Sequence, residues 1–223
     1  VNHVIPTGEP ERDDTLHQKY KTDIFEVGGD ISRPLAGGAI KLVALANRRD
    51  RTTFDDYLFR GLGGSPVLGG FEQFTKSKLA ESIAKLSWSR PELFGVSFEA
   101  GGEVAYNKLD YALDLFELEA GGERTPIELP LEDATVSELR GEFYVNAGRQ
   151  LSKALRVDAA LNYEISRLKV RGDATADRSL KFWKPSLTLD WRPGNDWHLQ
   201  LIGRRTVAQL DFYDFVSVAT LSN

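Results

Sequence analysis

The chain has 223 residues, a formal net charge of −5 and a mean hydropathy of −0.32, with no cysteine and no methionine. The absence of cysteine excludes disulfides and thiolate chemistry. The negative net charge argues against a nucleic-acid binder that depends on a strong positive field. The sequence also has no apolar run of the roughly 18 residues that a transmembrane helix needs. A sheet escapes the last exclusion if its apolar residues are spread over every second position of its strands.

The beginning of the chain is polar and the rest is predicted to be strands. Residues 1–18 are rich in Pro, Asp and Glu, and we expect a loop or a disordered end there. Residues 19–223 favour a β-barrel segment of eight strands in four hairpins. The hairpins are expected at about 19–33 with 39–60, 72–90 with 94–118, 136–149 with 154–171, and 179–192 with 197–210.

The connections between the expected strands alternate in length. Turns inside hairpins are short and contain Pro or Gly, as in 33–38 (RPLAGG) and 192–196 (RPGND). The connections between hairpins, at 61–70, 119–135 and 172–178, are longer. Short turns at one end and long loops at the other are typical of a transmembrane β-barrel, with the turns on the periplasmic side.

Strict alternation of apolar and polar residues supports the strands. It is clearest along 94–107, 139–147 and 155–164, where one face is apolar and the other polar or charged. The segment 78–85 is compatible with a short amphipathic helix, but Leu86 continues the alternation, so we predict a strand. The predicted fold is an all-β, antiparallel up-and-down transmembrane β-barrel, of which the chain supplies about eight strands.

The two faces of the strands define two sets of candidate residues. A polar set is expected to face the barrel lumen: Glu99, Glu103, Asn107, Arg140, Glu142, Tyr144, Asn146, Arg156, Asp158, Asn162 and Glu164. An apolar set is expected to face lipid or to form an aromatic girdle near the short turns: Trp88, Phe94, Val96, Phe98, Phe143, Leu161, Tyr163, Trp191 and Trp197.

Motifs for catalysis or metal binding are weak. His3, His17 and His198 are far apart and lack metal-ligand spacing, and the glycine-rich 61–66 (GLGGSP) lacks the Lys-Ser/Thr ending of a phosphate loop. Paired carboxylates at 13–14, 55–56 and 132–133 are expected to be solvated loop charges rather than calcium ligands. We therefore expect no catalytic residue, no metal and no cofactor, and a protein that is not an enzyme.

Five stretches resemble the barrel of TonB-dependent outer-membrane transporters. They are 26–35 (EVGGDISRPL), 86–91 (LSWSRP), 109–116 (LDYALDLF), 186–194 (SLTLDWRPG) and 204–215 (RRTVAQLDFYDF). The resemblance implies a receptor of a Gram-negative outer membrane that takes up a scarce ligand, such as an iron chelate, cobalamin or a glycan. It implies as partners the outer-membrane lipid, a plug domain, the rest of the barrel and, indirectly, the TonB system, with no nucleic acid.

The chain departs from that family pattern, so two other functions stay open. No plug-like segment or energy-coupling box is recognised, and about eight strands are expected where the family has about 22, so we expect a middle section of the barrel. One alternative is a self-contained eight-stranded outer-membrane barrel with a structural or adhesive role, closed between the strands near Ile24 and Leu199. The other is a soluble all-β binding module, in which Phe94, Val96 and Phe98 pack against a second sheet.

Overall fold

The protein is a single antiparallel β-sheet over the part of the chain that the structure describes. The structure is a computed structural model that describes residues 2–4, 12–63, 66–130, 132–194, 196–207 and 212. Nine strands follow each other in up-and-down order, β1-β2-β3-β4-β5-β7-β8-β9-β10, and β6 pairs with β5 beside this path. No helix among the described residues is both long and apolar enough to cross a membrane.

Most of the strands are far longer than those of ordinary globular sheets. Seven of them have 18 to 27 residues, whereas strands of globular proteins usually have about 3–10. The strands are β1 (Asn2–Val4), β2 (Arg12–Leu35), β3 (Gly38–Arg60), β4 (Val67–Leu93), β5 (Val96–Glu119), β6 (Arg124–Ile127), β7 (Asp133–Gln150), β8 (Leu155–Gly172), β9 (Ala176–Gly194) and β10 (Trp197–Arg204).

Two-residue turns close the first two hairpins. Ala36 and Gly37 have φ angles of 50° and 73°, and Phe94 and Gly95 have 55° and 74°. Two successive positive φ angles are the signature of a type I′ turn, whose twist matches that of the strands it joins. Phe94 was expected on the apolar face of a strand, and this was wrong. It lies in the turn itself, in a conformation that bulky residues rarely adopt, and is 93% exposed.

The observed strands differ from the expected ones mainly at their ends. A loop or disordered end was expected over 1–18, but β2 begins at Arg12 and pairs with β3 from Asp13 onward. Residues 12–18 lack apolar alternation because Leu16 is their only apolar residue, and pairing with β3, and with β1 over residues 12–14, makes them a strand. Residues 78–85 belong to β4, as predicted. Residues 5–11 and the expected strand end at 208–210 lie outside the described residues.

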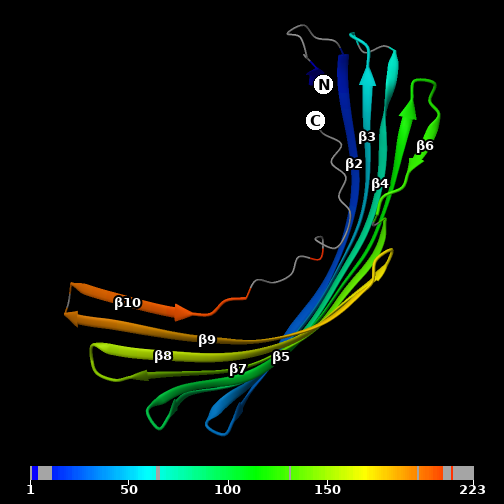
Figure 1. The fold of residues 1–223 in the computed structure, drawn as a ribbon. Helices are drawn as coiled ribbons and strands as arrows, with labels where there is room; N and C mark the ends of the chain where they lie inside the picture. Colours follow the sequence, from blue (N-terminus) through cyan, green and yellow to red (C-terminus); the bar gives the residue numbers. More distant parts are fainter. Residues whose placement is uncertain are drawn as a thin grey trace.

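The sheet is curved and open. Figure 1 shows it bent into a trough, with β2 and β10 at opposite edges. Among the described residues, β10 pairs only with β9, and β2 pairs with β3 and, over residues 12–14, with β1. The up-and-down antiparallel order is therefore confirmed, while the closure near Ile24 and Leu199 that a self-contained eight-stranded barrel requires is not present in the described sheet.

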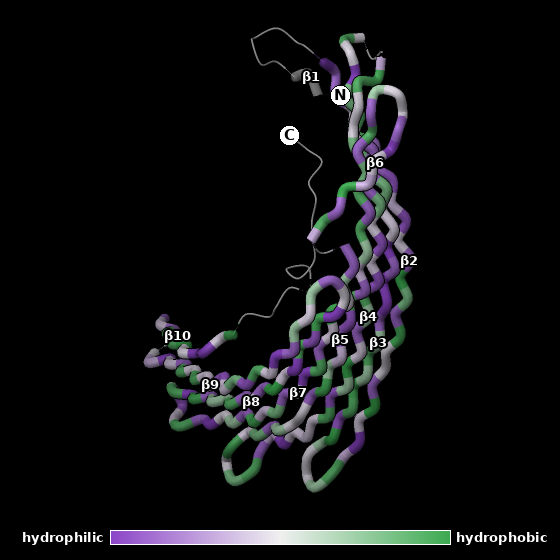
Figure 2. The backbone as a smooth tube through the Cα atoms, turned by 45° about the vertical axis from the view of Figure 1, so that its right-hand side comes forward, coloured by the Kyte–Doolittle hydropathy of each residue, from purple (hydrophilic) through white to green (hydrophobic). Residues whose placement is uncertain are grey.

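The curvature gives the sheet a concave and a convex face. Directly paired residues share a face, so the registers assign every strand position. Glu103 and Glu142 are paired on the concave face, and Gly102 and Phe143 on the convex one. Figure 2 shows hydrophilic and hydrophobic residues alternating along the strands. The buried hydrophobic core is a cluster on the concave face of β5, β7 and β8 that includes Leu109.

Candidate functional site

An apolar surface covers the convex face in the half of the sheet next to the short turns; we call it the apolar belt. It contains Phe25, Val27, Gly29 and Ile31 of β2; Ile40, Leu42, Ala44 and Ala46 of β3; Ala80, Ser82, Ala84, Leu86 and Trp88 of β4; Val96, Phe98, Ala100, Gly102, Val104 and Tyr106 of β5; Leu139, Gly141, Phe143, Val145 and Ala147 of β7; Leu155, Val157, Ala159, Leu161, Tyr163 and Ile165 of β8; Trp183, Pro185, Leu187, Leu189 and Trp191 of β9; and Leu199 and Leu201 of β10. Its side chains are open to the surroundings, with Phe143 62% and Ile31 61% exposed. A contiguous exposed apolar surface of this extent marks an interaction with lipid or protein.

The belt ends abruptly on every long strand, at a line that we call the boundary. The first convex residues beyond it are Asp23, Arg48, Lys78, Lys108, Ser137, Arg167 and Lys181. Six of these seven residues are charged. The concave face changes in the opposite sense, because Glu103 and Asn107 of β5 are followed by Leu109 and Leu113. On β5, β7, β8 and β9 the strands thus keep a period of two but exchange their polar and apolar faces at the boundary.

The boundary is slanted relative to the strands. Following paired residues from strand to strand, Phe25 is level with Lys108 of β5 and with Asp177 of β9. The last belt residue of β9 is Trp183, six residues (183 minus 177) nearer to the short turns, after six strand-to-strand steps. The boundary therefore shifts by one residue from each strand to the next. A residue rises about 3.3 Å along a strand and neighbouring strands lie about 4.8 Å apart, so the strands are tilted by about 35° from the normal of the boundary.

Aromatic side chains lie along both limits of the belt. Trp88 and Phe98 are in contact near the short turns, with ring centroids 5.9 Å apart, and Trp88 Nε1 donates a hydrogen bond of 3.0 Å to the carbonyl of Leu35. At the boundary, Tyr163 and Trp183 stack with ring centroids 4.3 Å apart. Of the nine residues expected on the apolar side, seven lie on the convex face: Trp88, Val96, Phe98, Phe143, Leu161, Tyr163 and Trp191. Trp197 begins β10 and is 76% exposed.

All eleven polar candidates lie together on the concave face. The registers bring them into adjacent rows of β5, β7 and β8. Tyr144 Oη donates to Glu99 Oε1 at 2.8 Å, and Arg140 Nη2 donates to Glu103 Oε1 at 3.1 Å. The concave side chains shield one another, which makes them less exposed than the belt residues on the opposite face of the same strands.

Lys184 of β9 organises this concave face, although it was not among the residues predicted to face the lumen. Its Nζ donates to Glu164 at 2.8 Å and also to Glu142, while Asn162 Nδ2 donates to Glu142 Oε1 at 2.8 Å. Glu142 and Glu164 are directly opposite each other on β7 and β8, where like charges repel, and the ammonium compensates this. The alternation of apolar Trp183 with charged Lys184 could have placed Lys184 on the polar face of a strand. Pro185 obscures this pattern, because proline is uncommon inside strands.

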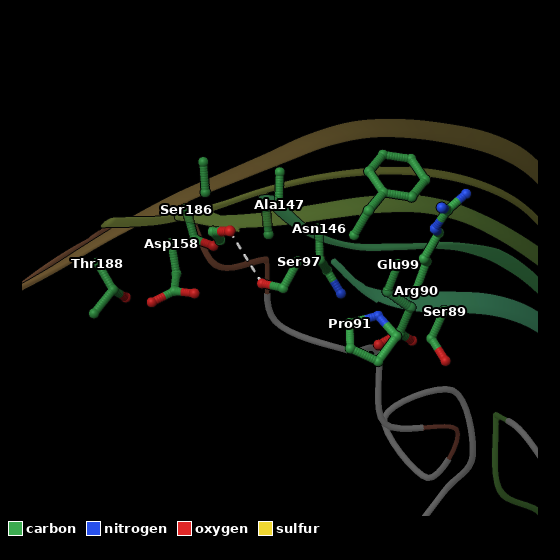
Figure 3. A pocket seen from close by; sticks show the side chains of 14 residues that line it. Ser89, Arg90, Pro91, Ser97, Glu99, Asn146, Ala147, Asp158, Ser186 and Thr188 are labelled. Carbon is green, nitrogen blue, oxygen red and sulfur yellow. Dashed lines mark hydrogen bonds between the residues drawn. The ribbon is translucent and has the colours of Figure 1, made fainter. Parts of the chain in front are cut away.

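A cavity of about 370 Å³ opens on the concave face near the short turns. Figure 3 shows Ser97, Asn146, Asp158 and Thr188 on the hollow side of the arched strands that form it. Arg156 Nη2 donates to Asp158 Oδ1 at 2.7 Å and to Ser97 Oγ at 3.3 Å, and so orients both. Hydroxyl, amide and carboxylate groups at this site can bind a polar ligand or the backbone of a polypeptide segment.

Beyond the boundary the concave face carries a packed apolar core and, at its outer rim, a buried carboxylate. Leu109 is fully buried within a cluster that Phe212 and Leu129 help to cover. At the outer rim, Asp14 accepts hydrogen bonds from Arg12 Nε at 2.7 Å and Tyr57 Oη at 2.8 Å. The bond from Arg12 holds the pKa of Asp14 below its usual value, although burial acts in the opposite direction.

Catalytic or metal-binding groups do not gather in the described part of the chain. Across those residues, no three His, Cys, Asp or Glu side chains are placed to share a metal ion. His198 contacts Asp190 at 2.6 Å, and His17 is 3.9 Å from Asp56. The paired carboxylates were expected in loops, but Asp13 and Asp14 belong to β2, Asp55 and Asp56 to β3, and Asp133 to β7.

Comparison of the chain with protein-family models, with curated proteins and with solved structures gave no match.

Proposed function

We propose that the chain forms part of the wall of an outer-membrane β-barrel, specifically the barrel of a TonB-dependent receptor that takes up a scarce ligand. The observation that carries this proposal is the abrupt end of the convex apolar belt along a single slanted boundary, at which β5, β7, β8 and β9 also exchange their polar and apolar faces. Two different solvents meet the convex face of the same strands: lipid over the belt and water beyond it. A soluble sandwich needs no such boundary on its outer surface.

The dimensions of the belt support a transmembrane assignment. The belt spans 11 residues on β5, 9 on β7 and 11 on β8, and transmembrane strands have about 9–11. The tilt of about 35° agrees with the 35–45° of outer-membrane barrels and gives the belt a height close to the typical value of about 25 Å. Aromatic residues at both limits correspond to the girdles at the two interfaces.

The open edges require further strands. Lipid provides no hydrogen-bond partners, so the backbone groups of β2 and β10 must be paired within the bilayer. In the proposed receptor, the rest of the barrel supplies these strands, and a plug domain occupies the polar concave face. The rows of Glu99, Arg140 and Lys184 would then contact the plug or line the ligand path. The five resembling stretches favour this receptor over other barrels.

A self-contained eight-stranded barrel is the second candidate. β2 runs toward the short turns and β10 runs away from them, so the two edges have the antiparallel orientation that direct closure needs. This barrel would have a structural or adhesive role. Disulfide trapping of Phe25→Cys with Leu199→Cys, both on the convex face, distinguishes the candidates, since a cross-link within one chain is expected only for the small barrel.

Single-cysteine labelling tests the membrane assignment, because the chain contains no cysteine of its own. Phe143→Cys in the belt and Ser137→Cys beyond the boundary lie on the same face of β7. In lipid vesicles, a membrane-impermeant maleimide is expected to label position 137 quickly and position 143 only after denaturation. Equal labelling of both positions, in a protein that stays monomeric without detergent, would favour the soluble binding module instead.

Uptake measurements test the receptor function itself. A strain that lacks the protein is expected to lose energy-dependent uptake of one ligand among ferric chelates, cobalamin and oligosaccharides. Restoring the wild-type gene should recover that uptake, and Lys184→Met should recover less of it. Unchanged uptake of all three ligand classes would leave the structural barrel as the better explanation.

A further inference from the structure

A basic cluster lies directly beyond the boundary on the convex face of β8 and β9. It consists of Arg167, Lys169, Arg171 and Lys181, and the registers place it beside hydroxyl groups of the neighbouring strands. Lys169 is paired with Ser137 of β7, Arg171 with Thr135 of β7, and Arg167 with Ser179 of β9. Cations interleaved with hydroxyl donors are the composition of a phosphate-binding surface.

The positive charge in this sector is less compensated than elsewhere along the boundary. On β3 and β5, Arg48 and Lys108 each bind a carboxylate two residues further on, Asp50 at 2.7 Å and Asp110 at 2.8 Å. Lys78 of β4 is paired with both of these aspartates. The boundary over β3–β5 is therefore nearly neutral.

The basic cluster, in contrast, keeps a surplus of positive charge. Arg167 binds Asp177 through Nε at 2.9 Å and Nη2 at 2.6 Å, which fixes the guanidinium on the surface. Among the described residues, neither Lys169 nor Lys181 has a carboxylate within ion-pair distance, although Asp177 is the cross-strand neighbour of Lys169. Asp133, near the far end of β7, is the other carboxylate on this part of the face.

We propose that the basic cluster binds the phosphate-bearing headgroup of an anionic membrane lipid, whose acyl chains lie on the adjacent belt residues Leu139, Ile165 and Trp183. This inference rests on the proposed membrane function. Headgroup phosphates of a bilayer lie just outside its hydrocarbon layer, and the cluster occupies that level if the belt occupies the hydrocarbon. The apolar residues would hold the chains while Lys169 and Lys181 compensate the phosphate charge.

Trp183 provides a local probe for this lipid, because it is the last belt residue before Lys181. In a variant whose other tryptophans are replaced (W88F, W191F, W197F), Trp183 fluorescence would be quenched by brominated phosphatidylglycerol and, separately, by brominated phosphatidylcholine in reconstituted vesicles. The ratio of the two affinities measures the preference for an anionic headgroup. We expect a severalfold preference that is lost in K169Q/K181Q, because each lysine near a phosphate contributes up to about 1 kcal/mol, or about fivefold.

The control removes the same charge from another place on the same face. Lys19 and Lys21 lie beyond the boundary on the edge strand β2, and Lys21 pairs with Asp23 at 2.9 Å. K19Q/K21Q should leave the preference at Trp183 unchanged. An equal loss in both double variants, or no preference in the wild type, would overturn the proposal.

Inorganic phosphate separates a lipid site from a site for the free anion. Added at millimolar concentration with the ionic strength held constant, it should not displace the brominated anionic lipid, because it gains nothing from the belt. Displacement would overturn the lipid assignment in favour of free phosphate. These measurements use the complete barrel that contains the chain. A complete barrel that does not enter vesicles at all would refute the membrane function, whereas entry without anionic preference would refute only this inference.

Discussion

The two halves of the sheet use the same strands and the same alternation in opposite ways. Next to the short turns, apolar side chains such as Phe143 point outward and charged ones such as Glu142 point inward. Beyond the boundary, Lys108 points outward and Leu109 is buried inward. The difference teaches that the period of a strand determines only that two faces differ, whereas the surrounding solvent determines which face is apolar.

The two halves should also differ in what stabilises them. In the belt half of the proposed barrel, the convex side chains would be covered by lipid, and the concave face would depend on paired charges. In the far half, the concave side chains form a packed core like that of a soluble protein. Substitutions of the same chemical kind should therefore have different effects in the two halves.

The largest difference is expected between two leucine truncations. Leu109→Ala opens a cavity in the packed core of the far half and should lower the free energy of unfolding by about 2–5 kcal/mol. Leu161→Ala in the belt should have an effect of less than about 1 kcal/mol, because lipid chains fill the space that the side chain leaves. Guanidinium unfolding in lipid vesicles measures both. Equal losses would mean that the belt packs against protein.

A charge introduced on the convex face should discriminate between the halves almost as strongly. Phe143 lies midway along the belt on β7, so Phe143→Arg should destabilise the vesicle-embedded protein by about 2–4 kcal/mol. Ser137→Arg, beyond the boundary on the same strand, should change stability by no more than about 0.5 kcal/mol. A reversed order of the two variants would contradict the position of the boundary.

The concave charge network in the belt half gives the third contrast. Lys184→Met keeps the aliphatic stem but leaves Glu142 and Glu164 opposed without their shared cation, which should cost about 2–3 kcal/mol of unfolding free energy. Adding Glu142→Gln should recover most of the loss, because it removes the repulsion. A double variant no more stable than the single one would show that repulsion between Glu142 and Glu164 does not cause the loss.

The sequence predicted the hairpins and the faces in the belt half because the alternation there is uninterrupted. Runs such as 139–147 and 155–164 lie within one solvent regime, so a single phase describes them. The exchange of faces was not predicted. In β5 the apolar residues occupy even positions up to Tyr106 and odd positions from Leu109 onward, so neither face is apolar over the whole strand. The role of Lys184 depends on a register between β8 and β9 that composition alone does not reveal.

The start of β2 shows a different limit of sequence reasoning. Residues 12–18 hold Asp14 almost completely buried, although their composition is that of a solvated loop. Their strand conformation comes from pairing with β3, which is a long-range property. A polar edge strand therefore carries little local signal, even where one of its carboxylates is buried and fully hydrogen-bonded.

The buried carboxylate of the far half leads to the last and smallest contrast, a dependence on pH. The pKa of Asp14 is lowered in the folded protein, chiefly by the hydrogen bond from Arg12, so Asp14 stabilises the fold fully above the unfolded value of about 3.9 and loses this contribution as the pH falls through the folded value. The protection of amide hydrogens around Tyr57, relative to their intrinsic exchange rates, should therefore fall as the pH drops from about 5 to about 3, while protection around Phe143 should show no such fall. Asp14→Asn should lower local protection at pH 7 by about 1–2 kcal/mol and remove the acid-dependent part. If the variant kept the acid dependence of the wild type, a carboxylate other than Asp14 would control the opening of the rim. The difference in pH dependence between the two halves would then be due to that other carboxylate.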